Sequence, residues 1–295
     1  MTINRYWLVA LIALGSLGLA FPAAAITVSP ARLTITADGG AKALVKLIVS
    51  NSDSSLITIA PRVVGVKQDE KGRTIVGSGF DAAEKWVAPE TASITLAPGA
   101  ERSIFFSVAP PSGTAPGSHY VGLAVAASLP ATSNTLALTG EVTSLLTIQV
   151  AGIVNEHIDV TRFELPSIIR RVNSIPATIE MRNTGSIEVP LAGEIRLATM
   201  KGKEIFSEPV PLGNALLPDS TRWLAPAINL SPPGLRPGIY TVSFIVTYGL
   251  TQQTAAASST LWYLPLWSLL ILGVLLLSCV GIITMRGKRR QSPAR

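Results

Sequence analysis

The chain has 295 residues with a formal net charge of +6, and 48% of its residues are hydrophobic. All 18 acidic residues and 18 of the 24 basic residues fall between positions 26 and 260, so this central part is neutral and the excess positive charge belongs to the two ends. The basic isoelectric point is therefore no sign of a nucleic-acid partner.

The N-terminal 25 residues predict a secretory signal peptide. Arg5 supplies the positive start, residues 8–21 form an apolar stretch, and the small residues of a cleavage site stand at 23–25. Cleavage there leaves Ile26 as the first residue of the mature chain. An uncleaved N-terminal membrane anchor is the alternative, although the apolar stretch is short for a bilayer span.

Beyond the signal peptide the hydrophobic pattern has a period of two, which indicates β-strands. In ATIEMRN (177–183), apolar residues alternate with Thr, Glu and Arg, and GEIRLAT (193–199) repeats the pattern. Turn signals such as Pro98-Gly99 and Pro116-Gly117 separate such stretches at intervals typical of a β-sandwich. We therefore predict an all-β fold of immunoglobulin-like (Ig-like) sandwiches.

Two parts of the chain share one spacing of landmark residues, which indicates a duplication. The pattern Leu-x-Pro-x-x-x-Arg at 96–102 returns at 216–222, an offset of 120, and VSNSDSS (49–55) matches MRNTGSI (181–187) more loosely at an offset of 132. The two offsets require an insertion or deletion between the landmarks. Chance similarity of Pro-Gly-rich loops is the alternative.

The duplication predicts two tandem Ig-like domains, residues 26–152 and 153–249. Each is large enough to have its own hydrophobic core. The stretch LTQQTAAASST, residues 250–260, is small and polar, and we predict that it forms a stalk.

Residues 261–285 contain no charge and predict a transmembrane helix. As a helix they would extend about 37 Å, enough to cross a bilayer with some tilt. Aromatic residues at the start favour the headgroup region: Trp262, Tyr263 and Trp267. The tail, residues 286–295, opens with basic residues that place it in the cytoplasm: Arg286, Lys288, Arg289 and Arg290. We therefore predict a single-pass membrane protein whose two domains lie outside.

The chain offers few groups for catalysis or metal binding. His119 and His157 are its only histidines and fall in different predicted domains, and the single cysteine, Cys279, lies in the predicted membrane span. This excludes Cys-His catalysis, the usual His-rich zinc sites and a disulfide-linked partner. We predict a protein that is not an enzyme, with no catalytic residue, no metal and no other cofactor.

The Pro-Gly pairs at 116–117 and 237–238 align two β-rich runs, SHYVGLAV and IYTVSFIV. A tyrosine just after such a turn often hydrogen-bonds back across the corner between the sheets, so we predict a structural corner at Tyr240 with His119 in the equivalent place. Tyr120 must then point to the outer face. We take Tyr120 and Trp86 as candidate ligand contacts, and packing at the core or an edge is the alternative for Trp86.

Several stretches resemble the N-terminal domain of bacterial WxL-interacting cell-surface proteins, namely ITVSPARLTI, VSNSDSS, Trp86, ITLAPGAERSIFFSVAPP and PGSHYVGLAV. The order of signal peptide, two β-sandwiches, membrane helix and basic tail is also the order of that family. The resemblance implies an Ig-like fold implicated in peptidoglycan binding, with the second domain as the more divergent part. It assigns no ligand residue.

The sequence thus favours a membrane-anchored bacterial surface protein that binds or adheres without catalysis. Its partner would be peptidoglycan or another surface protein. The alternative is a membrane-tethered chaperone or assembly factor that donates a sheet edge to a secreted client, so that the two pair by β-strand addition. That alternative requires an exposed edge strand in the first domain.

Overall fold

The computed structural model of the chain describes residues 26–128, 139–171, 174–229 and 235–290. The predicted signal peptide and residues 291–295 of the basic tail lie outside the described residues. For residues 283–290 the description covers the backbone alone.

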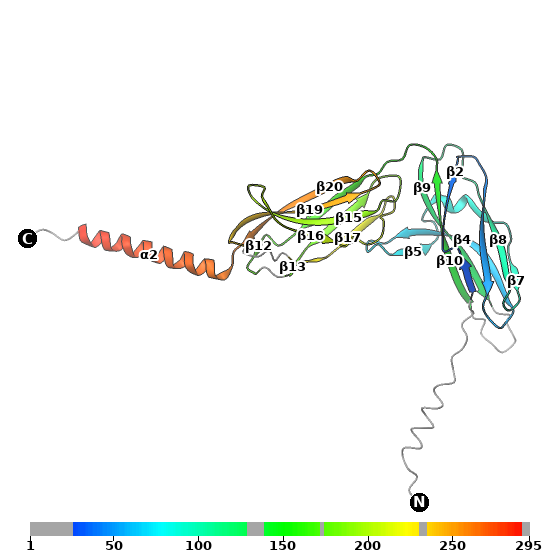
Figure 1. The fold of residues 1–295 in the computed structure, drawn as a ribbon, viewed down its shortest axis with the longest axis horizontal. Coiled ribbons are helices and arrows are strands. Elements are labelled where there is room, and N and C mark those ends of the chain that lie inside the picture. Colours follow the sequence, from blue (N-terminus) through cyan, green and yellow to red (C-terminus); the bar gives the residue numbers. More distant parts are fainter. Residues whose placement is uncertain (1–25, 129–138, 172–173, 230–234, 291–295) are drawn as a thin grey trace, which may run out of the picture. The chain divides into compact units, whose positions relative to one another are not determined.

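The chain forms two units that are described separately (Figure 1). One consists of Met1–Lys67 with Val76–Ile153, and the other of Gln68–Ile75 with Val154–Arg295. The short segment Gln68–Ile75 thus groups with the second unit, which the linear domain boundaries of the sequence do not anticipate. Strands form most of the regular structure in both units, and the second unit also contains the helix at the end of the chain, so the all-β class of the two domains is confirmed.

Within the described residues, the first unit is a sandwich of two sheets. One sheet has the order β1-β3-β8-β6, formed by β1 (Ile26–Ser29), β3 (Ala43–Asn51), β8 (Glu101–Val108) and β6 (Val87–Pro89). The other has the order β2-β10-β9-β4-β5 with β7 beside β4, formed by β2 (Arg32–Ala37), β10 (Thr139–Val150), β9 (Gly117–Ser128), β4 (Ile57–Gln68), β5 (Thr74–Gly77) and β7 (Ile94–Leu96). A short 3-10 helix, η1 (Ala82–Lys85), precedes β6.

Alternating apolar residues of both sheets form the core of the first unit. Leu47 on β3 and Phe106 on β8 meet Leu123 on β9 and Leu146 on β10, and all four side chains are fully buried. Removing such side chains from water stabilises the sandwich by roughly 1.5–3 kcal/mol each.

The second unit repeats this architecture. One sheet has the order β11-β14-β17, formed by β11 (Ile158–Glu164), β14 (Thr178–Asn183) and β17 (Thr221–Leu224). The other has the order β12-β20-β19-β15-β16, formed by β12 (Ile168–Ile169), β20 (Gln253–Tyr263), β19 (Gly238–Tyr248), β15 (Leu191–Thr199) and β16 (Glu204–Val210). A small additional sheet pairs β13 (Ser174–Pro176) with β18 (Ala227–Asn229), and helix α2 (Leu266–Arg290) follows β20.

Topology and burial both support the predicted duplication. The order β2-β10-β9-β4-β5 corresponds strand for strand to β12-β20-β19-β15-β16, and β1-β3-β8 corresponds to β11-β14-β17. The predicted register of β9 on β19 also pairs equally buried side chains, because all six are 0% exposed: Val121, Leu123, Val125, Val242, Phe244 and Val246.

One buried asparagine occupies the same place in each sandwich. The Asn51 amide nitrogen donates to the carbonyls of Ser55, Leu96 and Ala97 over 2.9–3.2 Å, and its Oδ1 accepts from the Asp53 N–H. These bonds join the end of β3 to the turn after it and to the end of β7.

Asn183 makes the corresponding bonds in the second unit. Its amide nitrogen donates to the carbonyls of Ile187 and Leu216, both at 2.8 Å, and its Oδ1 accepts from the Gly185 N–H at 2.9 Å. Both asparagines are at most 1% exposed. The looser sequence match at an offset of 132 therefore marks one conserved hydrogen-bond arrangement.

The Leu-x-Pro turns of the two units differ in the residue that follows the proline. The Gly99 N–H donates to the Asn51 carbonyl, and the Asp219 N–H donates to the Asn183 carbonyl, each at 3.0 Å. Both residues have a positive φ, 70° for Gly99 and 54° for Asp219. Only glycine adopts this conformation without steric cost. The first unit has glycine at this position, whereas Asp219 in the second unit adopts it at a steric cost.

Residues 253–260 of the predicted stalk belong to a strand, because β20 pairs with β19 along its whole length, and residues 250–252 lie in the turn between these strands. The prediction for residues 250–260 is wrong because small residues produce the period-two pattern of β20, with Ala255 and Ala257 partly buried. Leu261 is fully buried and Tyr263 is 8% exposed, so the second sandwich extends past Gly249 to Tyr263.

The predicted membrane span, 261–285, is divided between two elements. Trp262 and Tyr263 belong to β20, whereas Trp267 belongs to the first turn of α2. Over the part of the chain that the structure describes, none of the helices combines the length and hydropathy needed to cross a bilayer. The basic residues at 286–290 belong to α2.

We predict that Asn51→Ala and Asn183→Ala each destabilise their own unit by roughly 2–4 kcal/mol, since each leaves buried carbonyls without a donor. Native-state hydrogen exchange of the full chain, resolved by unit, measures the effect. Asn51→Ala should lower the protection of β3 and β8, and Asn183→Ala that of β14 and β17. Ser54→Ala, at an exposed neighbouring position, is the control with little effect. Unchanged exchange in the mutated unit would contradict the structural role of the asparagine.

We also predict that Asp219→Gly raises the free energy of unfolding by a few tenths to about 1 kcal/mol, because glycine relieves the positive φ. The exposed ion pair of Asp219 with Arg182, at 3.9 Å, is too weak to offset this gain. Gly99→Ala should have the opposite effect of about 1 kcal/mol. Urea unfolding of the two variants beside the unmodified chain tests the assignment, and a loss of stability in Asp219→Gly argues against it.

Candidate functional site

The first two strands of the first unit, β1 and β2, belong to different sheets. β1 pairs with β3 in one sheet, and the chain then crosses so that β2 pairs in parallel with β10 in the other. The parallel pairing starts at Leu145 with Arg32 and ends at Val150 with Ala37. Residues 139–143 of β10 therefore pair with β9 on one side and, among the described residues, with no strand on the other.

The backbone groups on this open side can be assigned. The Leu145 N–H donates to the Ala31 carbonyl at 2.9 Å and so points to the side of β2. Successive residues of a strand direct their backbone groups to opposite sides. Thr143, Glu141 and Thr139 therefore direct their N–H and C=O groups to the same side as Leu145, beyond the start of β2. We call residues 139–143 the free edge of β10.

Side chains around the free edge leave the backbone accessible to an added strand. Val142 packs against the core of the sandwich. Glu141 accepts from the Arg62 guanidinium at 2.6 Å, across Ala124 and Ala126 on the outer face of the sheet. The free edge contains neither proline nor lysine, the residues with which sheet edges commonly resist strand addition.

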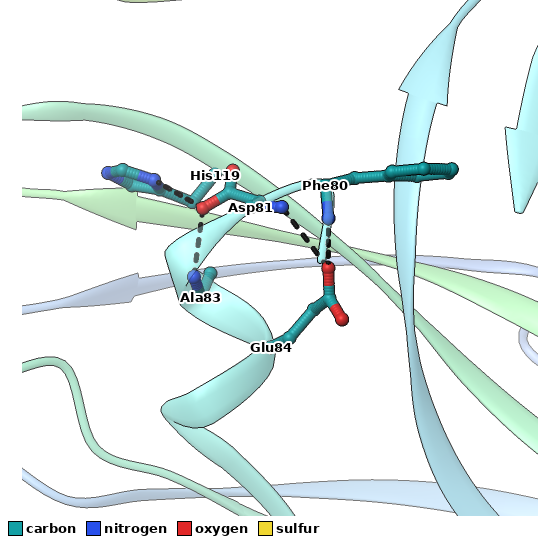
Figure 2. Close-up of polar contacts among 5 residues, drawn as sticks. All are labelled: Phe80, Asp81, Ala83, Glu84 and His119. Carbon is teal, nitrogen blue, oxygen red and sulfur yellow. Dashed lines mark hydrogen bonds and ion pairs between the residues drawn. The ribbon is translucent and has the colours of Figure 1, made fainter. Parts of the chain in front are cut away.

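A second cluster forms where the chain enters β9 (Figure 2). His119 Nδ1 lies 3.3 Å from Asp81 Oδ1, and the His119 ring meets Trp86 edge-on at a centroid distance of 4.6 Å. The structure thus brings together two residues that the sequence analysis treated separately. Trp86 is partly buried and packs against the core, which is the packing alternative of the sequence analysis.

Carboxylates hold the segment before η1 in place (Figure 2). Asp81 caps η1 by accepting from the Ala83 N–H at 2.8 Å, and Glu84 accepts from the N–H groups of Gly79, Phe80 and Asp81. This reciprocal arrangement is a capping box. Gly65 on β4 leaves space for the Glu84 carboxylate, because an added Cβ there would overlap Oε1.

These contacts shift the acidity of both carboxyl groups. Burial alone would raise the pKa of Asp81, but the hydrogen bonds from His119 and from the Ala83 N–H outweigh it and hold the pKa below its ordinary value of 3.8. For Glu84, burial likewise opposes the three backbone N–H groups, which lower its pKa. The charged forms therefore stabilise this segment at neutral pH.

Tyr120 lies on the face of β9 opposite to Leu123, as the alternation along a strand requires. Its exposure was predicted wrongly, because Tyr120 is only 3% exposed. Thr147 lies opposite Tyr120 on β10. The backbone N–H of Tyr120 donates to the Asp81 carboxylate. A period of two gives the direction of a side chain but not what covers that face, so the sequence could not show that Tyr120 has little surface for a ligand.

The predicted corner residues make different contacts. Tyr240 Oη donates to the Arg236 carbonyl at 2.6 Å, the bond back to the preceding turn that the corner prediction requires. His119 has the equivalent position in β9, but its partner is the Asp81 side chain. Within the described residues, no group of three or more His, Cys, Asp or Glu side chains is placed to hold a metal ion.

No family model and no curated protein matches the chain. Similar solved structures include the class 5 fimbriae chaperone CfaA, with a TM-score of 0.44 and 10% identity over 82% of this chain and 100% of that chain. The E. coli chaperone DraB has a TM-score of 0.41 and 13% identity, covering 80% and 98% of the two chains. The CupB2 chaperone of Pseudomonas aeruginosa has a TM-score of 0.36 and 12% identity, covering 79% and 98%.

Similarity of this degree assigns neither a family nor a function to this chain. The resemblance to WxL-interacting proteins stays a prediction from the sequence.

We predict that Asp81→Asn destabilises the first unit at neutral pH, because asparagine can still cap η1 but loses the charge beside His119. Since the folded-state pKa of Asp81 is lowered, its contribution is complete above the ordinary value of 3.8 and is lost as pH falls through the lower folded pKa. The difference in melting temperature between the unmodified chain and Asp81→Asn should be present at neutral pH and should shrink as the pH falls below 3.8 and through the lowered folded pKa. Asp38→Asn, at an exposed position, is the control, and a difference that persists in acid would contradict the assignment.

Proposed function

We propose that this chain is a non-enzymatic assembly factor that holds an extended segment of a secreted client protein as an additional strand on β10. The observation on which the proposal rests is the free edge of β10, whose residues 139–143 lack a strand partner on one side among the described residues. An exposed edge in the first domain is the feature that this alternative required at the sequence level.

The chemistry of the free edge favours an extended peptide over a small ligand. Backbone groups of Thr139, Glu141 and Thr143 repeat every second residue, which matches the hydrogen-bond spacing of an added strand. Main-chain bonds of this kind supply affinity for many sequences, and the side chains beside the edge supply selectivity. Val142, at the margin of the core, would contact apolar side chains of the client that face inward.

Export and attachment to a membrane complete the proposal. They rest on the sequence, namely the predicted signal peptide, the apolar stretch 261–285 and the basic residues after it. Adhesion to peptidoglycan rests on the family resemblance alone, since no contact of the described residues distinguishes a glycan ligand.

We predict that Thr143→Pro lowers client binding strongly while the sandwich stays folded. Proline removes the outward N–H of the free edge but leaves the pairing with β9, whose bonds come from the alternate residues. Thr143→Val keeps the N–H and a β-branched side chain and is the matched control. Quantitative proteomics of secreted and surface proteins, in cells that contain each variant at equal level, should show a subset depleted in Thr143→Pro only.

A depleted protein is then purified and mixed with the full chain. Hydrogen exchange should show protection of the Glu141 and Thr143 amides. In Thr143→Pro, which has no amide hydrogen at position 143, the protection of the Glu141 amide should be lost. Binding that protects other segments, or that is equal in the proline and valine variants, would contradict the proposal. Co-sedimentation with peptidoglycan sacculi that is unaffected by Thr143→Pro, together with an unaltered set of surface proteins, would favour adhesion instead.

A further inference from the structure

Helix α2 leaves from one end of the second unit (Figure 1), and three segments that carry basic residues lie at that end. Only Leu264 and Pro265 separate the end of β20 from the start of α2. The β15–β16 turn lies at this end because Thr199 pairs with Tyr240, which pairs with Leu261. The segment after β12 lies there because Ile169 pairs with Tyr263. These segments and the residue before the β19 turn carry five exposed cations: Arg170, Arg171, Lys201, Lys203 and Arg236.

Acidic groups do not neutralise these cations. Among the described residues, Glu164 and Glu204 are the acids nearest this end, and they form ion pairs with Arg162 at 3.3 Å and Arg196 at 3.8 Å. None of the five cations forms an ion pair with a described residue. The opposite end of the same unit contains Glu156 beside the β19–β20 turn and Asp219 beside the end of β14, so the unit has an uneven distribution of charge.

Exposed apolar side chains accompany the cations. Ile168 and Trp262 are partners on neighbouring parallel strands and therefore project from one face, with exposed fractions of 58% and 44%. Met200, in the turn with Lys201, is 65% exposed, and Trp267 in the first turn of α2 is 54% exposed. Side chains of this size are normally buried, and a group of them beside unpaired cations indicates a binding surface.

We propose that this basic end of the second unit, formed by residues 168–171, 200–203, Arg236 and Trp262, binds the surface of a bilayer that contains anionic lipids. Lysine and arginine attract the phosphate groups of such lipids, while tryptophan and aliphatic side chains enter the boundary between headgroups and acyl chains. Each basic residue near an anionic surface strengthens binding about fivefold. A second copy of the chain is a poor occupant, because two basic ends repel each other.

Two further observations favour a lipid surface as the occupant. Exposed apolar residues also follow the basic end in the chain, since Leu266, Trp267, Leu270 and Ile271 in the described part of α2 are exposed. The basic residues come from three separate segments of the chain, so their common position is a property of the fold and not of one basic run. The inference does not depend on the free edge of β10, which lies in the other unit.

The test uses the full chain with Cys279→Ser and a reporter cysteine that carries an environment-sensitive fluorophore. Met200→Cys places the reporter at the basic end, and Leu250→Cys places it in the β19–β20 turn at the opposite end. Each protein is incorporated into vesicles of phosphatidylcholine alone or of phosphatidylcholine mixed with phosphatidylglycerol. The Met200→Cys reporter should shift to shorter emission wavelength only in the anionic vesicles, and high salt should reverse the shift. The Leu250→Cys reporter should stay in a solvent-like environment throughout.

Charge variants distinguish lipid binding by the basic end from an emission shift that arises only because α2 holds the reporter near the vesicle. Arg170→Gln with Arg171→Gln should abolish most of the emission shift, whereas Lys71→Gln with Arg182→Gln, which removes the same charge from exposed positions elsewhere in the unit, should leave it intact. An equal shift in both kinds of vesicle, no shift in either, or a shift that persists in Arg170→Gln with Arg171→Gln would overturn the proposal. A shift in detergent that grows with protein concentration would instead assign this surface to a second copy of the chain.

Discussion

The buried asparagine at the end of β3, and its counterpart at the end of β14, is the interaction on which both sandwiches depend. An amide group that is withdrawn from water must find partners for its hydrogens and its oxygen, or the fold loses the free energy of their hydration. Asn51 meets this requirement only when three segments converge: the end of β3, the turn that follows it, and the end of β7. The same requirement at Asn183 fixes the corresponding segments of the second unit. Register and turn geometry are thereby specified by one side chain.

The change of sheet between β1 and β2 determines which strand edges lack a partner. Because β1 joins one sheet and β2 the other, β2 covers only the C-terminal half of β10. The second unit has the same division between β11 and β12, and β12 covers only Trp262 and Tyr263 of β20. An open segment on the last strand of each sandwich is therefore a consequence of topology. The side chains beside it differ, since Glu141 on β10 pairs with Arg62 whereas residues 253–261 of β20 have no charged side chain.

The sequence specified most of the strands because large apolar residues alternated clearly in them, as in β14 and β15. The pattern was missed in β20, whose Ala, Ser and Thr residues alternate between partly buried and exposed positions without a contrast in hydrophobicity. The free edge of β10 could not be predicted either, because it depends on where the first strand changes sheet. Ser29 and Pro30 mark that place in the sequence, but proline also occurs in many ordinary turns. Tyr120 shows a third limit, since its direction follows from the strand while its burial follows from tertiary contacts.

Divergence between the two copies has a physical explanation at the corner position. Leu96 follows Asn51 at a sequence separation of 45 in the first unit, whereas Leu216 follows Asn183 at a separation of 33 in the second. The longer interval contains η1 and the capping box of Asp81 and Glu84. Tyr240 can satisfy its hydroxyl within its own turn by bonding to Arg236. A histidine at the equivalent position is too short for that bond, and it instead contacts Asp81 in the longer interval. The insertion and the change from tyrosine to histidine are thus parts of one structural difference, in which a contact within a turn is replaced by a contact between η1 and β9.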